Sequence, residues 1–255
     1  MSSLILKIIA VASMLVDHTG SVFERQLPEF APYLRMFGRL AFPIFCFLIA
    51  EGYIKSRNVQ KYALRLLVLA VLSEIPFDMM VGARIQNDPV FINYASQNVF
   101  FTLFLGLIAI WAIDFNTKLH RPWKGWSIAL ICMFLASLIR ADYGIFGVAF
   151  IVVFSVFRGN HFRIILGFLG VLVVRYFLAH MGFHLGDMMI GQPFISTPTP
   201  RQLEWAAVNL LAGFSLPLIF MYNGHRGYDN KVLKCGFYAF YPVHMTILVA
   251  IHALV

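Results

Sequence analysis

Two polar side chains at helical spacing mark the first apolar stretch of the sequence, 4–23. Lys7 and His18 are eleven positions apart. In a helix this separation is about three turns, or roughly 16 Å, so both residues lie on one face. His18 then lies about halfway across a hydrocarbon core of ~30 Å. Ionisable groups at that depth are costly and are rarely kept without a function, and a neutral imidazole can accept a proton. We therefore predict that His18 is the reacting centre.

A second histidine occupies a matching position in the last apolar stretch, 234–253. His244 follows Lys234 by ten residues, or about 15 Å of helix, and Tyr241 lies within one turn before it. The equal depth of the two histidines favours a polar cavity shared by the first and last helices. The alternative is that each imidazole hydrogen-bonds a backbone carbonyl of a neighbouring helix.

Carboxylates near the end of a third apolar stretch, 60–80, could orient the histidine. Glu74 and Asp78 are one turn apart in this stretch, and the second apolar stretch opens with Arg39. Either carboxylate could hold His18 in its working tautomer, as carboxylates do in acyl-transfer sites. Structural pairing of Arg39 with Asp78 is the alternative.

Further polar groups lie near the expected membrane surfaces. Glu51 precedes Lys55 by four residues, which suits either a salt bridge or a functional carboxylate. Asn98 opens the fourth apolar stretch and could act as an oxyanion donor or a helix cap. The stretch Tyr222-Asn-Gly-His-Arg-Gly227 could bind phosphate groups, although the membrane orientation alone also explains its basic residue.

The composition is that of a membrane protein. Of the 255 residues, 60% are hydrophobic and 13% are charged, and the mean hydropathy is +0.77. Soluble domains are nearer half apolar and a quarter charged. The net charge of +8 comes largely from Lys and Arg in short loops, which argues against a nucleic-acid partner. The three cysteines are far apart and indicate neither a disulfide framework nor a metal site.

These patterns predict an all-α fold, a polytopic integral-membrane helical bundle of about nine transmembrane helices in one domain, 1–255. Most of the Lys and Arg residues fall at ends that are cytoplasmic if the N-terminus is cytoplasmic. Nine spans then place the C-terminus outside. The apolar stretch that contains Asp17 and His18 is expected to be a retained helix rather than a signal peptide. The expected spans are 4–23, 36–54, 60–80, 98–115, 124–140, 143–158, 162–181, 204–221 and 234–253.

Several of these stretches, in this order, resemble the TraX family. They are Asp17-His18-Thr-Gly20, Gly38-Arg39-Leu-Ala-Phe-Pro43, Asn98-Val-Phe-Phe101, Tyr143-Gly-Ile-Phe-Gly147 and Phe240-Tyr-Pro-Val-His244. The first helix, with ten residues between a basic residue and a histidine, is also similar to the wider group of transmembrane acyltransferases. The TraX family is associated with N-terminal acetylation of conjugative pilin in the bacterial inner membrane.

The resemblance implies an acetyltransferase that uses acetyl-CoA from the cytoplasm. The acceptor is then a peptide amine, such as a pilin N-terminus, or a glycan hydroxyl, and a homodimer is left open. The expected catalytic set comprises His18, Asp17, Glu74, Asp78, His244 and Tyr241. The expected acetyl-CoA-binding set comprises Lys7, Arg39, Glu51, Asn98, Tyr222, Asn223 and Arg226.

Two other classes of protein fit the same polar residues. A proton-coupled transporter uses buried histidines and carboxylates as a proton relay. A non-enzymatic assembly factor uses them to hold helices together, and substitution of His18 would then damage folding rather than turnover.

Replacing Lys7 tests the acetyl-CoA assignment. Lys7→Ala removes a cation from the expected entrance for the phosphate groups, so the apparent KM for acetyl-CoA should rise while kcat changes little. Steady-state kinetics of the purified protein measure both constants. An unchanged KM would remove Lys7 from the binding site.

Overall fold

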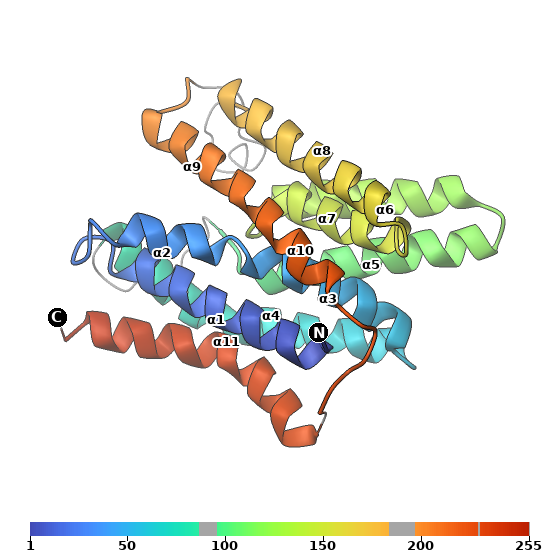
Figure 1. Cartoon of the computed structure of the whole chain (residues 1–255), viewed down its shortest axis with the longest axis horizontal. Helices are drawn as coiled ribbons and strands as arrows, with labels where there is room; N and C mark the ends of the chain where they lie inside the picture. Colours follow the sequence, from blue (N-terminus) through green and yellow to red (C-terminus); the bar gives the residue numbers. More distant parts are fainter. Residues whose placement is uncertain (87–95, 184–196, 229, 255) are drawn as a thin grey trace. The chain divides into compact units, whose positions relative to one another are not determined.

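The computed structural model describes residues 1–86, 96–183, 197–228 and 230–254, and regular structure within them is helical (Figure 1). Besides the helices, Gln97 and Ala141 form an isolated parallel bridge. The all-α prediction is confirmed. The elements are α1 (Ser3–Val22), α2 (Ala31–Gly38), α3 (Ala41–Lys55), α4 (Val59–Gln86), α5 (Val99–Lys118), α6 (Pro122–Leu138), α7 (Gly144–Val156), α8 (His161–His180), α9 (Pro200–Leu210), the 3₁₀ turn η2 (Leu211–Phe214), α10 (Ser215–Phe220) and α11 (Lys231–His252).

Seven helical segments of the described chain are long and apolar enough to cross a membrane. They correspond to α1, α2 with α3, α4, α5, α8, α9 through α10, and α11. The protein is therefore a multi-pass membrane protein. The prediction of nine spans was approximate, because it counted α6 and α7, which have 17 and 13 residues. At 1.5 Å per residue α7 reaches only about 20 Å, less than the ~30 Å of a hydrocarbon core.

The boundaries of two predicted spans also differ from the structure. The stretch 36–54 belongs to two helices, which are separated by a turn at Arg39 and Leu40. Pro43 lies in the first turn of α3, where its missing N–H removes no helical hydrogen bond. Helix α4 extends to Gln86 and contains Pro76.

The chain forms two compact units, each built from separate segments of the sequence. The first unit comprises Met1–Phe45, Val71–Tyr94 and Phe214–Val255; the second comprises Cys46–Ala70 and Ala95–Gly213. Two of the boundaries fall inside α3 and α4, so these two helices contribute to both units. The organisation as one domain stays a prediction.

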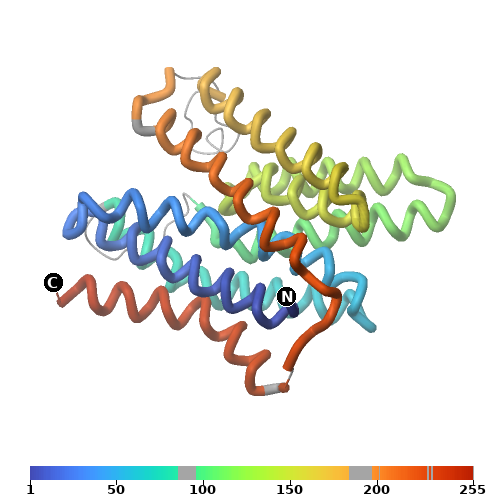
Figure 2. Tube along the Cα trace, viewed as in Figure 1, coloured from blue at the N-terminus to red at the C-terminus, as the bar shows by residue number. Residues whose placement is uncertain are grey.

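In the first unit, α1 packs against both α2 and α11 (Figure 2). Two glycines allow the close approach of α2. A Cβ atom at Gly20 would lie 2.7 Å from the Cβ of Leu34, and one at Gly38 would lie 2.2 Å from the Cβ of Asp17. Small residues of this kind let membrane helices pack closely without a hydrophobic driving force.

Helices α1 and α11 run in the same direction. Lys7 lies over the ring of Phe237, His18 contacts His244, and Phe23 packs against His252. Residue numbers therefore rise together along both helices. If both span the bilayer, the chain crosses it an odd number of times.

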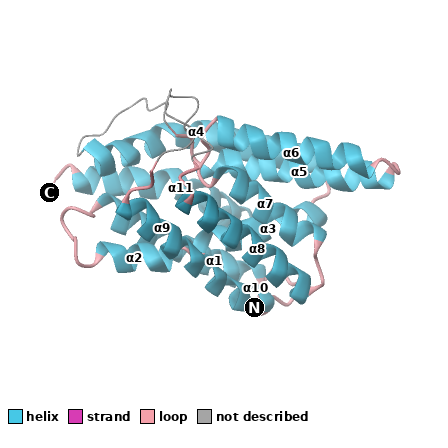
Figure 3. Ribbon diagram, turned by 90° about the horizontal axis from the view of Figure 1, so that it is seen from above, coloured by secondary structure: helices cyan, strands magenta, loops and turns pink. Residues whose placement is uncertain are grey.

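In the second unit, α5 packs against α6 and α7, and α8 packs against α7 and α9 (Figure 3). Phe150 and Phe154 of α7 pack on Phe168 of α8, with ring centroids 4.5 Å and 5.7 Å apart. Asn98 and Asn160 cap the first turns of α5 and α8 by accepting hydrogen bonds from backbone N–H groups.

The contact between α5 and α6 gives a test of this packing. A Cβ atom at Gly125 of α6 would lie 2.8 Å from the backbone of α5, whereas one at Gly170 of α8 would meet nothing within 4 Å. Gly125→Ala should therefore lower the free energy of unfolding by about 1–3 kcal/mol, because the helices must separate. The matched change Gly170→Ala should be neutral or stabilising by up to ~1 kcal/mol. Equal melting temperatures of the two variants in detergent would contradict this packing.

Candidate functional site

Two imidazole rings meet where α1 packs against α11. The Nδ1 atom of His18 lies 2.6 Å from the Nε2 atom of His244, a hydrogen-bonding distance. Their ring centroids are 4.9 Å apart and the ring planes differ by 11°. His244 is buried, with 4% of its surface exposed, whereas His18 is of intermediate exposure. The sequence predicted equal depth for these histidines, and the structure brings them into direct contact.

The second ring is anchored in its own helix. The Nδ1 atom of His244 lies 2.7 Å from the carbonyl oxygen of Phe240, one turn earlier in α11. The Phe240 ring stacks on the imidazole with centroids 4.7 Å apart. Tyr241 is buried and its ring is edge-on to both imidazoles. Its ring centroid is 6.1 Å from that of His18 and 5.8 Å from that of His244. We call His18, His244 and Tyr241 the histidine cluster.

Lys7 lies on the same side of α1 as His18. Its Nζ atom is 5.7 Å from the centroid of the ring of Phe237, a residue of α11. A cation over an aromatic face is favourable, and the contact keeps the Lys7 side chain against α11. The expectation that Lys7 and His18 share a face is confirmed.

The segment 221–227 is attached to the start of α1. The backbone N–H groups of Ser3 and Leu4 donate to the carbonyl oxygens of His225 and Arg226, at 2.9 and 3.2 Å. The Ser3 hydroxyl also donates to the Arg226 carbonyl at 3.0 Å. These bonds satisfy N–H groups that the first turn of a helix otherwise leaves without partners. Tyr222, Asn223 and Arg226, predicted to bind acetyl-CoA, therefore lie at the end of the first unit where α1 begins.

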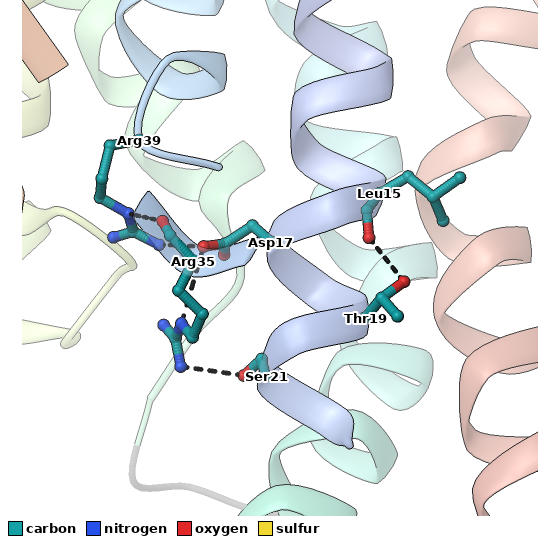
Figure 4. A network of polar contacts seen from close by, with 6 residues as sticks. All are labelled: Leu15, Asp17, Thr19, Ser21, Arg35 and Arg39. Carbon is teal, nitrogen blue, oxygen red and sulfur yellow. Dashed lines mark hydrogen bonds and ion pairs between the residues drawn. The ribbon is translucent and has the colours of Figure 1, made fainter. Parts of the chain in front are cut away.

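Asp17 points to α2 and not to α11 (Figure 4). Its Oδ1 atom accepts a hydrogen bond from Nη2 of Arg39 and lies 3.6 Å from Nε of Arg35. Arg35 donates to the Ser21 hydroxyl at 3.2 Å, and Nε of Arg39 donates to the Arg35 carbonyl at 3.2 Å. Adjacent residues of a helix point about 100° apart, which is why Asp17 and His18 contact different helices.

These contacts change the expected roles of Asp17 and Arg39. The structure pairs Arg39 with Asp17. The pairing of Arg39 with Asp78 that the sequence suggested stays a prediction. Asp17 holds α2 on α1 beside the histidine cluster. Its prediction as a catalytic residue and that of Arg39 as an acetyl-CoA ligand stay predictions.

Glu74 and Asp78 lie on α4 in the first unit. Asp78 is buried with 5% of its surface exposed, and Glu74 is of intermediate exposure. Pro76 lies between them inside the helix. Their expected role in orienting His18 stays a prediction, because the described contact of the His18 Nδ1 atom is with His244.

Two of the residues predicted to bind acetyl-CoA, Glu51 and Asn98, belong to the second unit and form hydrogen bonds or ion pairs with other residues there. Glu51 is buried and accepts a hydrogen bond at 2.8 Å from Nε of Arg158, while Lys55 lies 3.4 Å away. The predicted Glu51–Lys55 salt bridge is thus present, with Arg158 added. Asn98 is fully buried; it caps α5 through Phe100 N–H at 3.0 Å and donates to the Ala70 carbonyl at 2.7 Å. Its structural role as a helix cap is confirmed.

Sequence reasoning missed three contributors to these sites. Arg35 lies one turn before Arg39, so helical spacing could have indicated a second cation for Asp17. The Phe240 carbonyl is one turn before His244, and the same rule could have found it. Arg158 is 107 residues from Glu51, and no local pattern marks that pair.

Replacing Asp17 tests whether it acts through stability. Asp17→Ala leaves two largely buried guanidinium groups without their shared carboxylate, so the free energy of unfolding should fall by about 3–5 kcal/mol. The matched change Asp114→Ala removes a carboxylate that is 41% exposed, pairs with Lys118 and accepts a hydrogen bond from the Tyr53 hydroxyl, and should cost about 1 kcal/mol. Denaturant titration in micelles measures both. A smaller loss for Asp17→Ala than for Asp114→Ala would contradict the assignment.

Comparisons with known proteins agree with the resemblance seen in the sequence motifs. The family model described as "TraX protein" matches residues 2–252. The chain is 32% identical over 248 residues to "Probable fimbrial assembly protein FimC, serogroup H1" of Dichelobacter nodosus, covering 95% of this chain and 92% of that protein. No solved structure matches significantly. With a match that spans nearly every residue, from before α1 to the end of α11, this chain belongs to the TraX family.

Proposed function

We propose that this protein is a membrane-embedded acetyltransferase, in which His18 promotes transfer of an acetyl group from acetyl-CoA to an acceptor. The observation that carries the proposal is the contact between His18 and His244 inside an apolar helix pair. Buried polar side chains without structural need are expected at functional sites of membrane proteins. Membership of the TraX family and the cation Lys7 on the same interface support this choice of chemistry.

Direct transfer needs one base from the protein and forms no covalent bond to it. His18 accepts a proton from the acceptor amine as its nitrogen attacks the thioester carbonyl carbon. A carbon–nitrogen bond forms and the carbon–sulfur bond breaks. The departing thiolate then takes from His18 the proton that came from the amine. A positioned base of this kind contributes roughly 10²–10⁴-fold to the rate. In the variant with an acetyl-histidine intermediate, His18 attacks the thioester carbonyl first and the carbon–sulfur bond breaks to release the thiolate. The acceptor amine then displaces the ring from the acetyl group, and the amine proton goes to the thiolate.

Acetyl-CoA enters from the end of the first unit where α1 begins. Lys7 and Arg226 come from segments joined by the hydrogen bonds of Ser3 and Leu4. Phosphate groups of coenzyme A suit such cations. The remaining distance from Lys7 to His18, about 16 Å along α1, is comparable to the length of an extended pantetheine arm.

The membrane is the bacterial inner membrane, with the N-terminus in the cytoplasm. The excess of Lys and Arg at the ends of alternate helices favours this orientation. The parallel course of α1 and α11 supports an odd number of crossings, which puts the C-terminus on the opposite side.

The acceptor is the N-terminal amine of a pilus subunit. The relative from Dichelobacter nodosus is named as a fimbrial assembly protein, which favours an acceptor in a surface filament. A glycan hydroxyl is the alternative acceptor for the same site, since it too becomes a nucleophile when a base removes its proton.

A proton-coupled transporter is the second candidate function. Its supporting observation is the same imidazole pair, because hydrogen-bonded histidines also conduct protons. Coenzyme A separates the two functions: it should raise the melting temperature of the acetyltransferase and leave that of a carrier for other solutes unchanged.

The proposal is tested by the variant His18→Ala. Radiolabelled acetyl-CoA is supplied to the purified protein, with membranes from cells that lack it as the source of acceptor. Transfer should fall by about 10²–10⁴-fold, because the base is lost. Membrane insertion and melting temperature should change little. Mass spectrometry of filament proteins and envelope glycans identifies the acetylated group.

His252→Ala is the matched control for this variant. It removes another buried imidazole of the same interface, one that packs on Phe23. It should retain acetyl transfer. Activity of His18→Ala comparable to that of the control would contradict the proposal.

A further inference from the structure

The hydrogen bond between His244 and Phe240 fixes where the protons of the histidine cluster lie. A backbone carbonyl oxygen can only accept, so the Nδ1 atom of His244, 2.7 Å from the Phe240 oxygen, must carry a hydrogen. In a neutral imidazole the other nitrogen then has a lone pair. The Nε2 atom of His244 is therefore an acceptor, and the Nδ1 atom of His18, 2.6 Å away, must be the donor.

We infer that His244 is a positioning residue that holds His18 in the tautomer with its proton on Nδ1 and its lone pair on Nε2. The inference rests on the proposed function for its catalytic consequence, but the hydrogen-bond argument does not. Among the described residues, His18 Nε2 takes part in no hydrogen bond. It is the atom that accepts the proton of the acceptor amine, or that carries the acetyl group.

This arrangement gives His244 the role of orienting His18, which the sequence suggested for a carboxylate. A carboxylate was expected to orient His18, and His244 was placed in the catalytic set without a stated role. In the structure the nearby carboxylate of Asp17 is paired with Arg39 and Arg35, and His244 uses both ring nitrogens within the chain. A neutral imidazole fixes the tautomer without the cost of placing an unpaired carboxylate among apolar helices.

The surrounding rings keep His244 in this orientation. Phe240 stacks on one face with planes 14° apart, and only 4% of the His244 surface is exposed. A side chain held by packing and by a second hydrogen bond is preorganised for its partner. When His18 Nε2 accepts a proton, the charge is shared: the Nδ1 proton can move to His244 Nε2, and His244 still donates to the Phe240 carbonyl. When the thiolate leaves it takes the proton from His18 Nε2, and the shared proton returns from His244 Nε2 to His18 Nδ1.

Two substitutions at position 244 separate tautomer control from packing. His244→Gln retains an amide oxygen near the position of Nε2 and can accept the His18 proton, whereas His244→Leu fills the space but accepts nothing. We expect kcat for acetyl transfer to fall by at least about 100-fold in His244→Leu and by less than ~10-fold in His244→Gln. The KM for acetyl-CoA should stay within about two-fold in both, because ground-state binding is not touched. His252→Leu is the matched control and should retain transfer.

Nitrogen NMR of histidine-labelled protein in nanodiscs reads the tautomer without any activity measurement. The signals of His18 are assigned by their absence in His18→Gln. At a pH where both rings are neutral, His18 should show a protonated Nδ1 and an unprotonated Nε2. In His244→Leu this preference should be lost, and in His244→Gln it should be retained.

The outcomes distinguish the two claims. A proton on His18 Nε2, or equal activity of the Gln and Leu variants, would overturn the role of His244. A wild-type protein that shows the expected tautomer but transfers no acetyl group would overturn the proposed function and leave the tautomer assignment intact. The expected tautomer together with selective rescue by Gln supports both.

Discussion

The candidate site depends on one contact between the first and the last helix of the chain. His18 and His244 are 226 residues apart in sequence, and their hydrogen bond forms only when α11 lies along α1. Closing so long a loop has an entropic cost that grows slowly with length. The bonds from Ser3 and Leu4 to the segment before α11, and the packing of Phe23 on His252, support the same alignment at both ends. The site is thus complete only after the last helix has been added.

Helix α1 directs the adjacent side chains of Asp17 and His18 to different neighbouring helices. Asp17 satisfies the guanidinium groups of α2, and this ion pair lies next to His18 in sequence but on another face. On the face toward α11, His18 meets the rings of Tyr241 and His244, which belong to α11. Breaking the ion pair would leave buried charge, whereas changing the imidazole face alters only neutral hydrogen bonds. The two faces therefore have different roles: one stabilises the helix pair, and the other is available for proton transfer.

Much of this arrangement could be predicted from the sequence, because helical spacing is a local property. The all-α membrane fold, the shared face of Lys7 and His18, and the equal depth of His18 and His244 all follow from counting residues along apolar stretches. The break at Arg39 and Leu40 and the short helix α7 could not be found this way, since apolar composition does not report where a helix ends. Pairings between distant segments were the weakest part of the prediction. The ion pair of Arg39 with Asp17 was not foreseen, because a sequence does not give the rotation of one helix relative to another. The tautomer of His18 depends on such a distant contact, and only the structure reveals it.

The central claim is that a thioester from the cytoplasmic side reaches His18 Nε2, and a cryo-EM structure with a non-hydrolysable acetyl-CoA analogue tests it most directly. We expect density for the analogue that begins near Lys7 and Arg226 and places its carbonyl carbon beside the His18 Nε2 atom, with room for an acceptor nitrogen about 3.5 Å or less from that carbon. Density for the analogue that is remote from the α1–α11 interface, or a His18 ring sealed by neighbouring helices from any opening on that side, would contradict it.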